Sequence, residues 1–226
     1  MEYERKFKIG KPILEVNNIS LTFGGVKAIT DTSFNVLEHE VRAIIGPNGA
    51  GKSSMLNCIN GIYKPQEGTV SFRGQVIPNI TPNIMAQMGL SRTFQNLALF
   101  KRMSVLDNIL VGRKLHTKTN FLEVALQLPK VKKEEKLNRD RSEEIISFLE
   151  IEDIKDTPVG KLPYGLQKKV ELGRALATDS SIILLDEPMA GMNVEEKRDM
   201  CRFILKVNDE LGTTMVLIEH DMGVVM

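Results

Sequence analysis

Residues 46–53 read GPNGAGKS, in which two glycines, a lysine and a hydroxyl residue stand at the spacing of a phosphate-binding loop. An apolar run at 41–45 precedes them and helical spacing at 52–60 follows, so the loop joins a strand to a helix. Glycines let backbone N–H groups converge on phosphate oxygens at the positive end of that helix. The ammonium of Lys52 suits β- and γ-phosphates, and the hydroxyl of Ser53 suits Mg²⁺. A glycine-rich turn that precedes a lysine by chance would not explain both flanks, so the sequence predicts a nucleotide-binding loop.

Residues 182–188 read IILLDEP, an apolar strand that ends in two acids. In open α/β sheets, ligands bind at the carboxyl ends of the strands, which is where Asp186 lies. We expect Asp186 to hold Mg²⁺, directly or through water, and Glu187 to polarise the attacking water as a general base. Taken alone, the acids could equally be the start of an acidic loop, but the phosphate loop upstream favours the metal site.

Two further polar residues follow predicted strands and so reach the same sheet edge. Gln95 comes after residues 90–94 and could contact Mg²⁺ or the attacking water. His220 follows an apolar strand near the C-terminus and could contact the γ-phosphate and orient the water. The residues alone leave both roles open beside a purely structural one. His39 and His116 follow no such pattern, and we interpret both as structural.

The chain has 226 residues with 42% hydrophobic content, which fits one large α/β domain over residues 1–226. Its 30 basic and 29 acidic residues leave a net charge of +1, so charge gives no sign of nucleic acid or an anionic membrane as partner. Cys58 and Cys201 lie in apolar helical patterns, which is typical of buried thiols in a reducing compartment and indicates a cytoplasmic protein. The first 12 residues have no apolar stretch, so we expect neither a signal peptide nor a lipid anchor. No run approaches the roughly 18 apolar residues of a membrane helix, so a role at a membrane would require another subunit.

The apolar periodicity predicts a nucleotide-binding core with an antiparallel β part at 13–95, a helical subdomain at 96–165, and the core continued at 166–226. The charged, helical stretch at 104–149 marks the inserted subdomain. Asn193 and Glu196 form a capping pair for a helix that begins at Val194. The other expected elements are antiparallel strands at 13–23 and 28–36, a hairpin at 69–77, a strand at 90–94, a helix at 166–178, and strands at 182–185 and 214–218.

Taken together, these motifs resemble those of ABC transporter ATPases in their order and approximate spacing, over nearly the whole chain. The motifs are the phosphate loop, Gln95, LPYGLQ at 162–167, the acid pair and His220. More narrowly, the Tyr-Gly variant of the signature segment, RTFQN at 92–96, AGMN at 190–193 and IEHDM at 218–222 resemble the ATPase subunits of branched-chain amino acid importers. The resemblance implies a P-loop NTPase core with an N-terminal antiparallel β subdomain and an inserted helical subdomain.

The resemblance also implies that two such subunits, identical or related, clamp two ATP molecules head to tail, each phosphate loop facing the partner's signature segment. Residues 190–193 would line the dimer seam, and residues 95–103 with the helical subdomain would grip permease subunits at the cytoplasmic side of the cell membrane. A substrate-binding protein would be engaged indirectly. ATP and Mg²⁺ are the implied cofactors.

The site residues that the motifs and the resemblance give fall into three groups by role. The nucleotide contacts are Phe23 on adenine, the loop residues Gly46, Pro47, Asn48, Gly49, Ala50, Gly51, Lys52, Ser53 and Ser54, and, toward the partner's ATP, Tyr164, Gly165, Leu166 and Gln167. The catalytic residues are Glu187, His220 and Gln95, and the metal ligands are Ser53, Gln95 and Asp186.

The sequence departs from the family pattern at several places. Pro163 stands where the common signature has a serine, so a hydroxyl donor and a backbone N–H are both missing, and Leu166 replaces the usual glutamine. Asn193 replaces the usual aspartate at the dimer seam but keeps an acceptor. Family members normally run some tens of residues beyond the histidine, so an end at Met226 predicts a truncated C-terminus.

Other functions fit the motifs less well. A soluble ABC ATPase that works on DNA or the ribosome usually has a coiled-coil insertion or tandem ATPase units, which this sequence lacks. A non-catalytic regulatory module is disfavoured by Glu187, and a P-loop kinase would not explain the signature segment together with His220. A lipid or lipopolysaccharide exporter stays open, because the permease and the binding protein choose the cargo.

Overall fold

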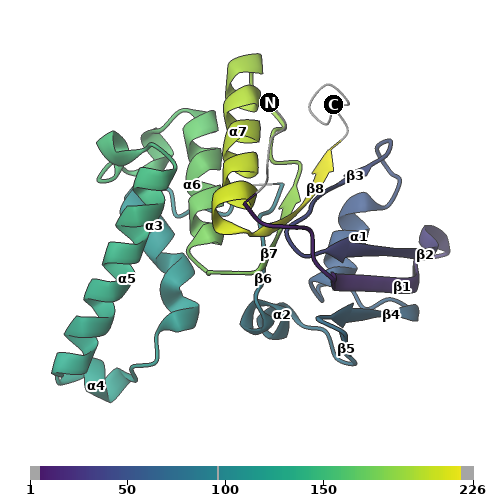
Figure 1. Cartoon of the computed structure of the whole chain (residues 1–226), viewed down its shortest axis with the longest axis horizontal. Helices are drawn as coiled ribbons and strands as arrows, with labels where there is room; N and C mark the ends of the chain where they lie inside the picture. Colours follow the sequence, from purple (N-terminus) through teal and green to yellow (C-terminus); the bar gives the residue numbers. More distant parts are fainter. Residues whose placement is uncertain (1–5, 96, 220–226) are drawn as a thin grey trace. The chain divides into compact units, whose positions relative to one another are not determined.

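Figure 1 shows the chain as a computed structural model, which describes residues 6–95 and 97–219. The described residues divide into two compact units. The first, the sheet unit, combines the residues up to Gln95 with those from Ser181 onward, and the second, the helical unit, comprises the residues between them. The predicted helical subdomain at 96–165 falls within the helical unit, which extends to Ser180 and so also takes in residues 166–180, predicted to belong to the continued core. Within the described ranges, every helix is too short or too polar to span a membrane.

The sheet unit contains a parallel sheet, and the strand ends that were predicted to bind ligands belong to this sheet (Figure 1). Its strands, in spatial order, are β3 (Val41–Ile45), β8 (Thr214–Glu219), β7 (Ile182–Asp186) and β6 (Leu90–Arg92). All three pairings are parallel, and β7 and β8 are buried along their whole length, as expected for strands covered on both faces. The predicted strand at 90–94 ends two residues early, because the last backbone bond from this segment to β7 joins Thr93 N–H to Leu184 O.

An antiparallel sheet, of order β2-β1-β4-β5, forms the other half of the sheet unit. Its strands are β1 (Pro12–Phe23), β2 (Val26–Leu37), β4 (Glu67–Phe72) and β5 (Gln75–Val76), which confirms the predicted antiparallel strands and hairpin. One apolar core joins the two sheets, because Ile19 and Phe72 cluster with Leu184 and Val216 of the parallel sheet. Met55 and Leu56, which follow the phosphate loop in the sequence, belong to the same core.

In the described part of the sheet unit there are also three helices: α1 (Lys52–Ile59), α2 (Pro82–Met88) and α7 (Val194–Leu211). The predicted capping pair of α7 is confirmed, since Asn193 and Glu196 form a full capping box. The short helix α2 was not predicted; Thr81 caps its N-terminus and Gly89, in the left-handed region, ends it.

The helical unit contains α3 (Val105–Gly112), α4 (Phe121–Ala125), α5 (Pro129–Phe148), α6 (Tyr164–Leu176) and the 3₁₀ turns η1 (Arg113–His116), η2 (Glu152–Ile154) and η3 (Val159–Lys161). The helix predicted at 166–178 begins and ends two residues earlier, because Pro163 fixes the backbone just before the first turn. Helices α3 and α6 approach closely, since a Cβ on Gly112 would lie 2.3 Å from the carbonyl oxygen of Arg174.

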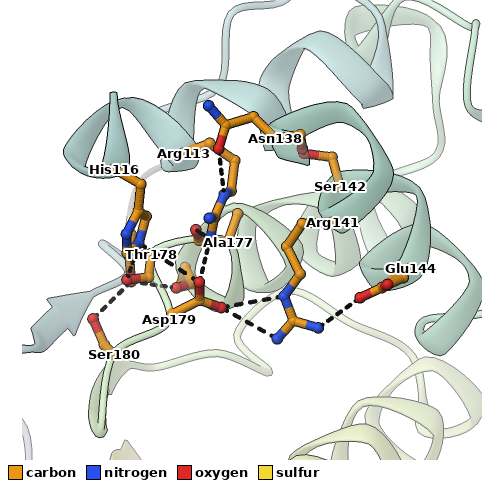
Figure 2. Close-up of polar contacts among 11 residues, drawn as sticks. Arg113, His116, Asn138, Arg141, Ser142, Glu144, Ala177, Thr178, Asp179 and Ser180 are labelled. Atoms are coloured by element: carbon orange, nitrogen blue, oxygen red, sulfur yellow. Dashed lines mark hydrogen bonds and ion pairs between the residues drawn. The ribbon is translucent and has the colours of Figure 1, made fainter. Parts of the chain in front are cut away.

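A polar network ties the end of α6 to η1 and α5 (Figure 2). The buried guanidinium of Arg113 donates to Ala177 O at 2.9 Å and to Asn138 Oδ1 at 3.2 Å, and it pairs with Asp179. Arg141 donates to the other carboxylate oxygen of Asp179 at 3.2 Å. Two arginines from different elements therefore share one carboxylate. The imidazole of His116 also bonds within this network, in keeping with the structural role expected for it.

The Asp179 network makes the stability of the protein depend on pH. Burial raises the pKa of Asp179, but hydrogen bonds and positive charge from Arg113 and Arg141 outweigh it and hold the pKa below its usual value. The stabilisation is therefore present above about pH 4 and is lost as the pH falls through the lowered folded-state pKa. We expect Asp179→Asn to lower the free energy of unfolding at pH 7 by roughly 1–3 kcal/mol, less than for a fully buried pair because Asp179 is partly exposed.

Urea unfolding at pH 7 and pH 3 would measure this contribution. The difference between wild type and Asp179→Asn should shrink at pH 3, whereas Asp153→Asn, at an exposed carboxylate of the same unit, should leave stability nearly unchanged at both pH values. A difference that is equal at both pH values would contradict the ion-pair interpretation.

Candidate active site

The phosphate loop lies between β3 and α1 and has the backbone that its glycines allow. Gly49 and Gly51 have φ of 83° and 81°, in the left-handed region that favours glycine. A Cβ on Gly51 would lie only 2.2 Å from the carbonyl oxygen of Ala28, so no other residue fits there. Gly51 is also the N-cap of α1 and has no side chain to occupy the first N–H groups of the helix. The loop thus presents a helix N-terminus, a ready site for an anion.

The ammonium of Lys52 is held over the loop itself. Lys52 is 9% exposed, and its Nζ donates to the carbonyl oxygens of Gly46 at 2.5 Å and Pro47 at 2.9 Å. Beside it lies a cavity of about 210 Å³, lined by Ala28, residues 48–54 and Glu187. The cation, the helix N-terminus and a carboxylate therefore meet at one small cavity.

Asp186 and Ser53 face each other beside this cavity. The Ser53 hydroxyl donates to Asp186 Oδ1 at 3.2 Å. The described residues contain no cluster of three or more histidine, cysteine or acidic side chains that could cage a metal. A carboxylate and a hydroxyl next to a phosphate site are the donor set that suits Mg²⁺, which takes few protein ligands and completes its shell with phosphates and water. The residues present therefore fit Mg²⁺.

Glu187 is turned toward the cavity by an unusual backbone. Its φ is +48°, a region that non-glycine residues rarely adopt and that concentrates at functional sites. Its N–H donates to Ile218 O at 3.1 Å, and its Oε2 accepts from Gln95 Nε2 at 2.9 Å. The structure thus brings together the loop, Asp186, Glu187 and Gln95. His220 lies outside the described residues.

Arg92 was not predicted to be a site residue. Its Nη2 pairs with Asp186 Oδ2 at 2.7 Å and its Nη1 donates to Asn57 Oδ1 at 2.6 Å. The side chains of Arg92 and Asp186 are each 4% exposed. The sequence signal that could have revealed this contact is an arginine within the predicted strand that Gln95 follows; only the structure shows that β6 runs beside β7.

The remaining predicted nucleotide contacts belong to other elements of the chain. The Phe23 ring, 45% exposed, contacts Tyr63 edge-on with ring centroids 5.0 Å apart. Tyr164, Gly165, Leu166 and Gln167 form the first turn of α6 in the helical unit. The Gln167 side-chain amide donates to Leu162 O at 2.8 Å and so already has a partner within its own unit.

A phosphate loop after β3 and an acid pair at the end of β7, in one parallel sheet with β8 between these two strands, define a P-loop nucleotide hydrolase. Residues 29–190 match the family described as ABC transporter, and the chain belongs to this family. The predicted family, fold class and ATPase class are therefore confirmed.

Curated relatives cover almost the whole chain. The chain is 36% identical over 218 residues to the high-affinity branched-chain amino acid transport ATP-binding protein BraF of Pseudomonas aeruginosa, covering 96% of this chain and 86% of the relative. It is 34% identical, with the same coverage, to LivG of Escherichia coli, described in the same words. It is 36% identical over 214 residues to the probable LivG of Methanocaldococcus jannaschii, covering 95% of this chain and 82% of the relative.

Solved structures with the same fold are cassettes of ABC transporters. A nucleotide-free ATP-binding cassette has a TM-score of 0.81 and 35% identity, covering 95% of this chain and 83% of its own. A cassette in the ADP conformation has a TM-score of 0.81 and 36% identity with the same coverage. A dimeric cassette in a post-hydrolysis state, bound to ADP and Pi, has a TM-score of 0.75 and 25% identity, covering 93% of this chain and 89% of its own.

Proposed function

We propose that this chain is the ATP-hydrolysing subunit of an importer of branched-chain or related amino acids. The observation that carries the hydrolysis is the cavity shared by the phosphate loop and Glu187, with Gln95 bonded to that carboxylate. The cargo class rests on the 34–36% identity to three relatives named for branched-chain amino acid transport.

Residues 46–54 bind the triphosphate, with Lys52 supplying a positive charge to the β- and γ-phosphates. Ser53, Asp186 and Gln95 would hold Mg²⁺, which when bound would neutralise phosphate charge. Glu187 accepts the proton of the attacking water as general base, and Gln95 holds its carboxylate at 2.9 Å.

The other predicted contacts complete this site. His220 contacts the γ-phosphate, and Phe23 offers an exposed ring for adenine to stack on.

The working form is a dimer in which each loop faces the partner's signature segment. Dimeric relatives of known structure support this assembly. Tyr164, Gly165, Leu166 and Gln167 then contact the ATP of the other subunit, and this contact rests on donors other than those that Pro163 lacks. Through residues 95–103 and the helical subdomain, the dimer binds permease subunits at the cytoplasmic side of the cell membrane, and the substrate-binding protein is engaged indirectly through the permease.

Uptake by a reconstituted transporter tests the cargo. Vesicles that contain this chain, the permease subunits that co-purify with it and their binding protein should take up labelled leucine only when ATP is inside. Vesicles assembled with the Glu187→Gln chain serve as the control and should take up none. Hydrolysis that responds to lipid, without amino acid uptake, would instead support the ATPase of a lipid or lipopolysaccharide exporter. Hydrolysis by a chain that co-purifies with no membrane subunit would support a soluble ABC ATPase.

A further inference from the structure

One short segment at the end of β6 holds both acids at the end of β7. Arg92 pairs with Asp186 through Nη2 at 2.7 Å, and Gln95 donates to Glu187 at 2.9 Å. The two contacts join residues that are 94 and 92 positions apart in the chain. The segment 92–95 therefore positions the whole acid pair.

The two oxygens of Asp186 have different partners. Oδ1 accepts from the hydroxyl of Ser53 at 3.2 Å, and Oδ2 accepts from Arg92. Asn57 of α1 holds the second amino group of the same guanidinium at 2.6 Å, which fixes the plane of the fork. One oxygen thus faces the side of the phosphate loop while the other is neutralised by a buried cation.

Burial makes the charge of Arg92 effective. Both side chains of the pair are 4% exposed, so solvent screens their interaction little. A carboxylate beside a guanidinium attracts a divalent cation less strongly than a carboxylate that lacks one. The affinity of Asp186 for a metal ion is therefore reduced until phosphate oxygens add negative charge to the site.

We propose that Arg92 is a positioning residue that orients Asp186 and weakens divalent-cation binding in the absence of nucleotide. The metal ion then binds tightly only together with the nucleotide phosphates. This inference rests on the proposed function, since it requires Asp186 to be a metal ligand.

Titration with Mn²⁺, a paramagnetic stand-in for Mg²⁺, tests the proposal on the full chain, with free Mn²⁺ counted by electron paramagnetic resonance. Arg92→Gln should raise the affinity for Mn²⁺ without nucleotide by at least about tenfold, because a nearby positive charge is removed. Arg92→Lys keeps the charge and should stay close to wild type. With ADP present, the difference between Arg92→Gln and wild type should be smaller.

A matched control removes another buried arginine of an ion pair. Arg113→Gln, in the helical unit, breaks the pair with Asp179 and should lower stability without changing Mn²⁺ affinity. If Arg92→Gln likewise loses stability but leaves Mn²⁺ affinity unchanged, Arg92 is only structural and the proposal is overturned. A weaker affinity for Mn²⁺ would overturn it too.

Two further variants keep the test decisive. If Arg92→Gln does not fold, Asn57→Ala loosens the guanidinium while keeping both charges, and should raise the nucleotide-free Mn²⁺ affinity by roughly two- to tenfold. An unchanged affinity in this variant would count against the proposal. Asp186→Asn should remove most Mn²⁺ binding in the presence of ADP. Full Mn²⁺ binding by Asp186→Asn would show that the metal site itself was misplaced, which is a failure of the proposed function and not of Arg92 alone.

Discussion

Replacing Glu187 with Gln is expected to lower the rate of ATP hydrolysis by roughly 10²- to 10⁴-fold while leaving ATP binding intact. The reason is that a glutamine amide cannot accept a proton from the attacking water at neutral pH. The side chain would keep its size and its place at the cavity beside the phosphate loop. Steady-state phosphate release, measured beside equilibrium binding of ATP, separates the two effects.

The same variant also tests the proposed dimer. With hydrolysis blocked, ATP and Mg²⁺ should trap two subunits together, and the molecular mass in solution should double. Glu195→Gln is the matched control, because it removes one exposed carboxylate of the same unit and should leave both hydrolysis and mass unchanged. Hydrolysis at the wild-type rate by the Glu187→Gln protein would remove Glu187 from the role of general base. A monomer that still binds ATP would separate base catalysis from self-association.

Replacing Lys52 with Ala is expected to weaken ATP binding by roughly 10- to 100-fold, the loss of one or more charge-assisted hydrogen bonds in a buried site. The side chain is 9% exposed and its ammonium lies beside the cavity. The substitution also removes the two hydrogen bonds from Nζ to the loop carbonyls, which stabilise the loop when no nucleotide is bound. Calorimetric titration with ATP and Mg²⁺ would measure the change.

Lys64→Ala provides the comparison for the lysine variant. Lys64 is exposed in the same unit, so its loss changes the net charge equally without touching the loop. If both Lys52→Ala and Lys64→Ala kept the ATP affinity of the wild type, the ammonium of Lys52 would not reach the phosphates. A large loss in both variants would point to the overall charge of the unit.

The local elements followed from the sequence because their determinants are local. Alternating apolar residues gave the antiparallel strands, and the capping box of α7 depends on two residues three positions apart. The predictions that were wrong concern the ends of helices and strands and the shortest helix. The start of α6 moved to Tyr164 because the constraint of Pro163 acts on the first turn, and α2 has only seven residues, too few for a clear helical period.

For the candidate site, the sequence by itself determined which loop and which side chains take part. It gave the phosphate loop, Asp186 and Glu187, because each motif combines residue types at a spacing that one strand end or one loop fixes. Gln95 was predicted because it follows a strand end in the same way, but the sequence did not predict its contact with Glu187.

Only the tertiary structure decided how these parts meet. Strand β3 lies beside β8, more than 150 residues away in the sequence, and β6 lies beside β7. Parallel strands pair through long crossovers, so their order in the sheet is not written in any local pattern. The pairing of Arg92 with Asp186, and the bond between Gln95 and Glu187, exist because β6 and β7 end at the same edge of the sheet.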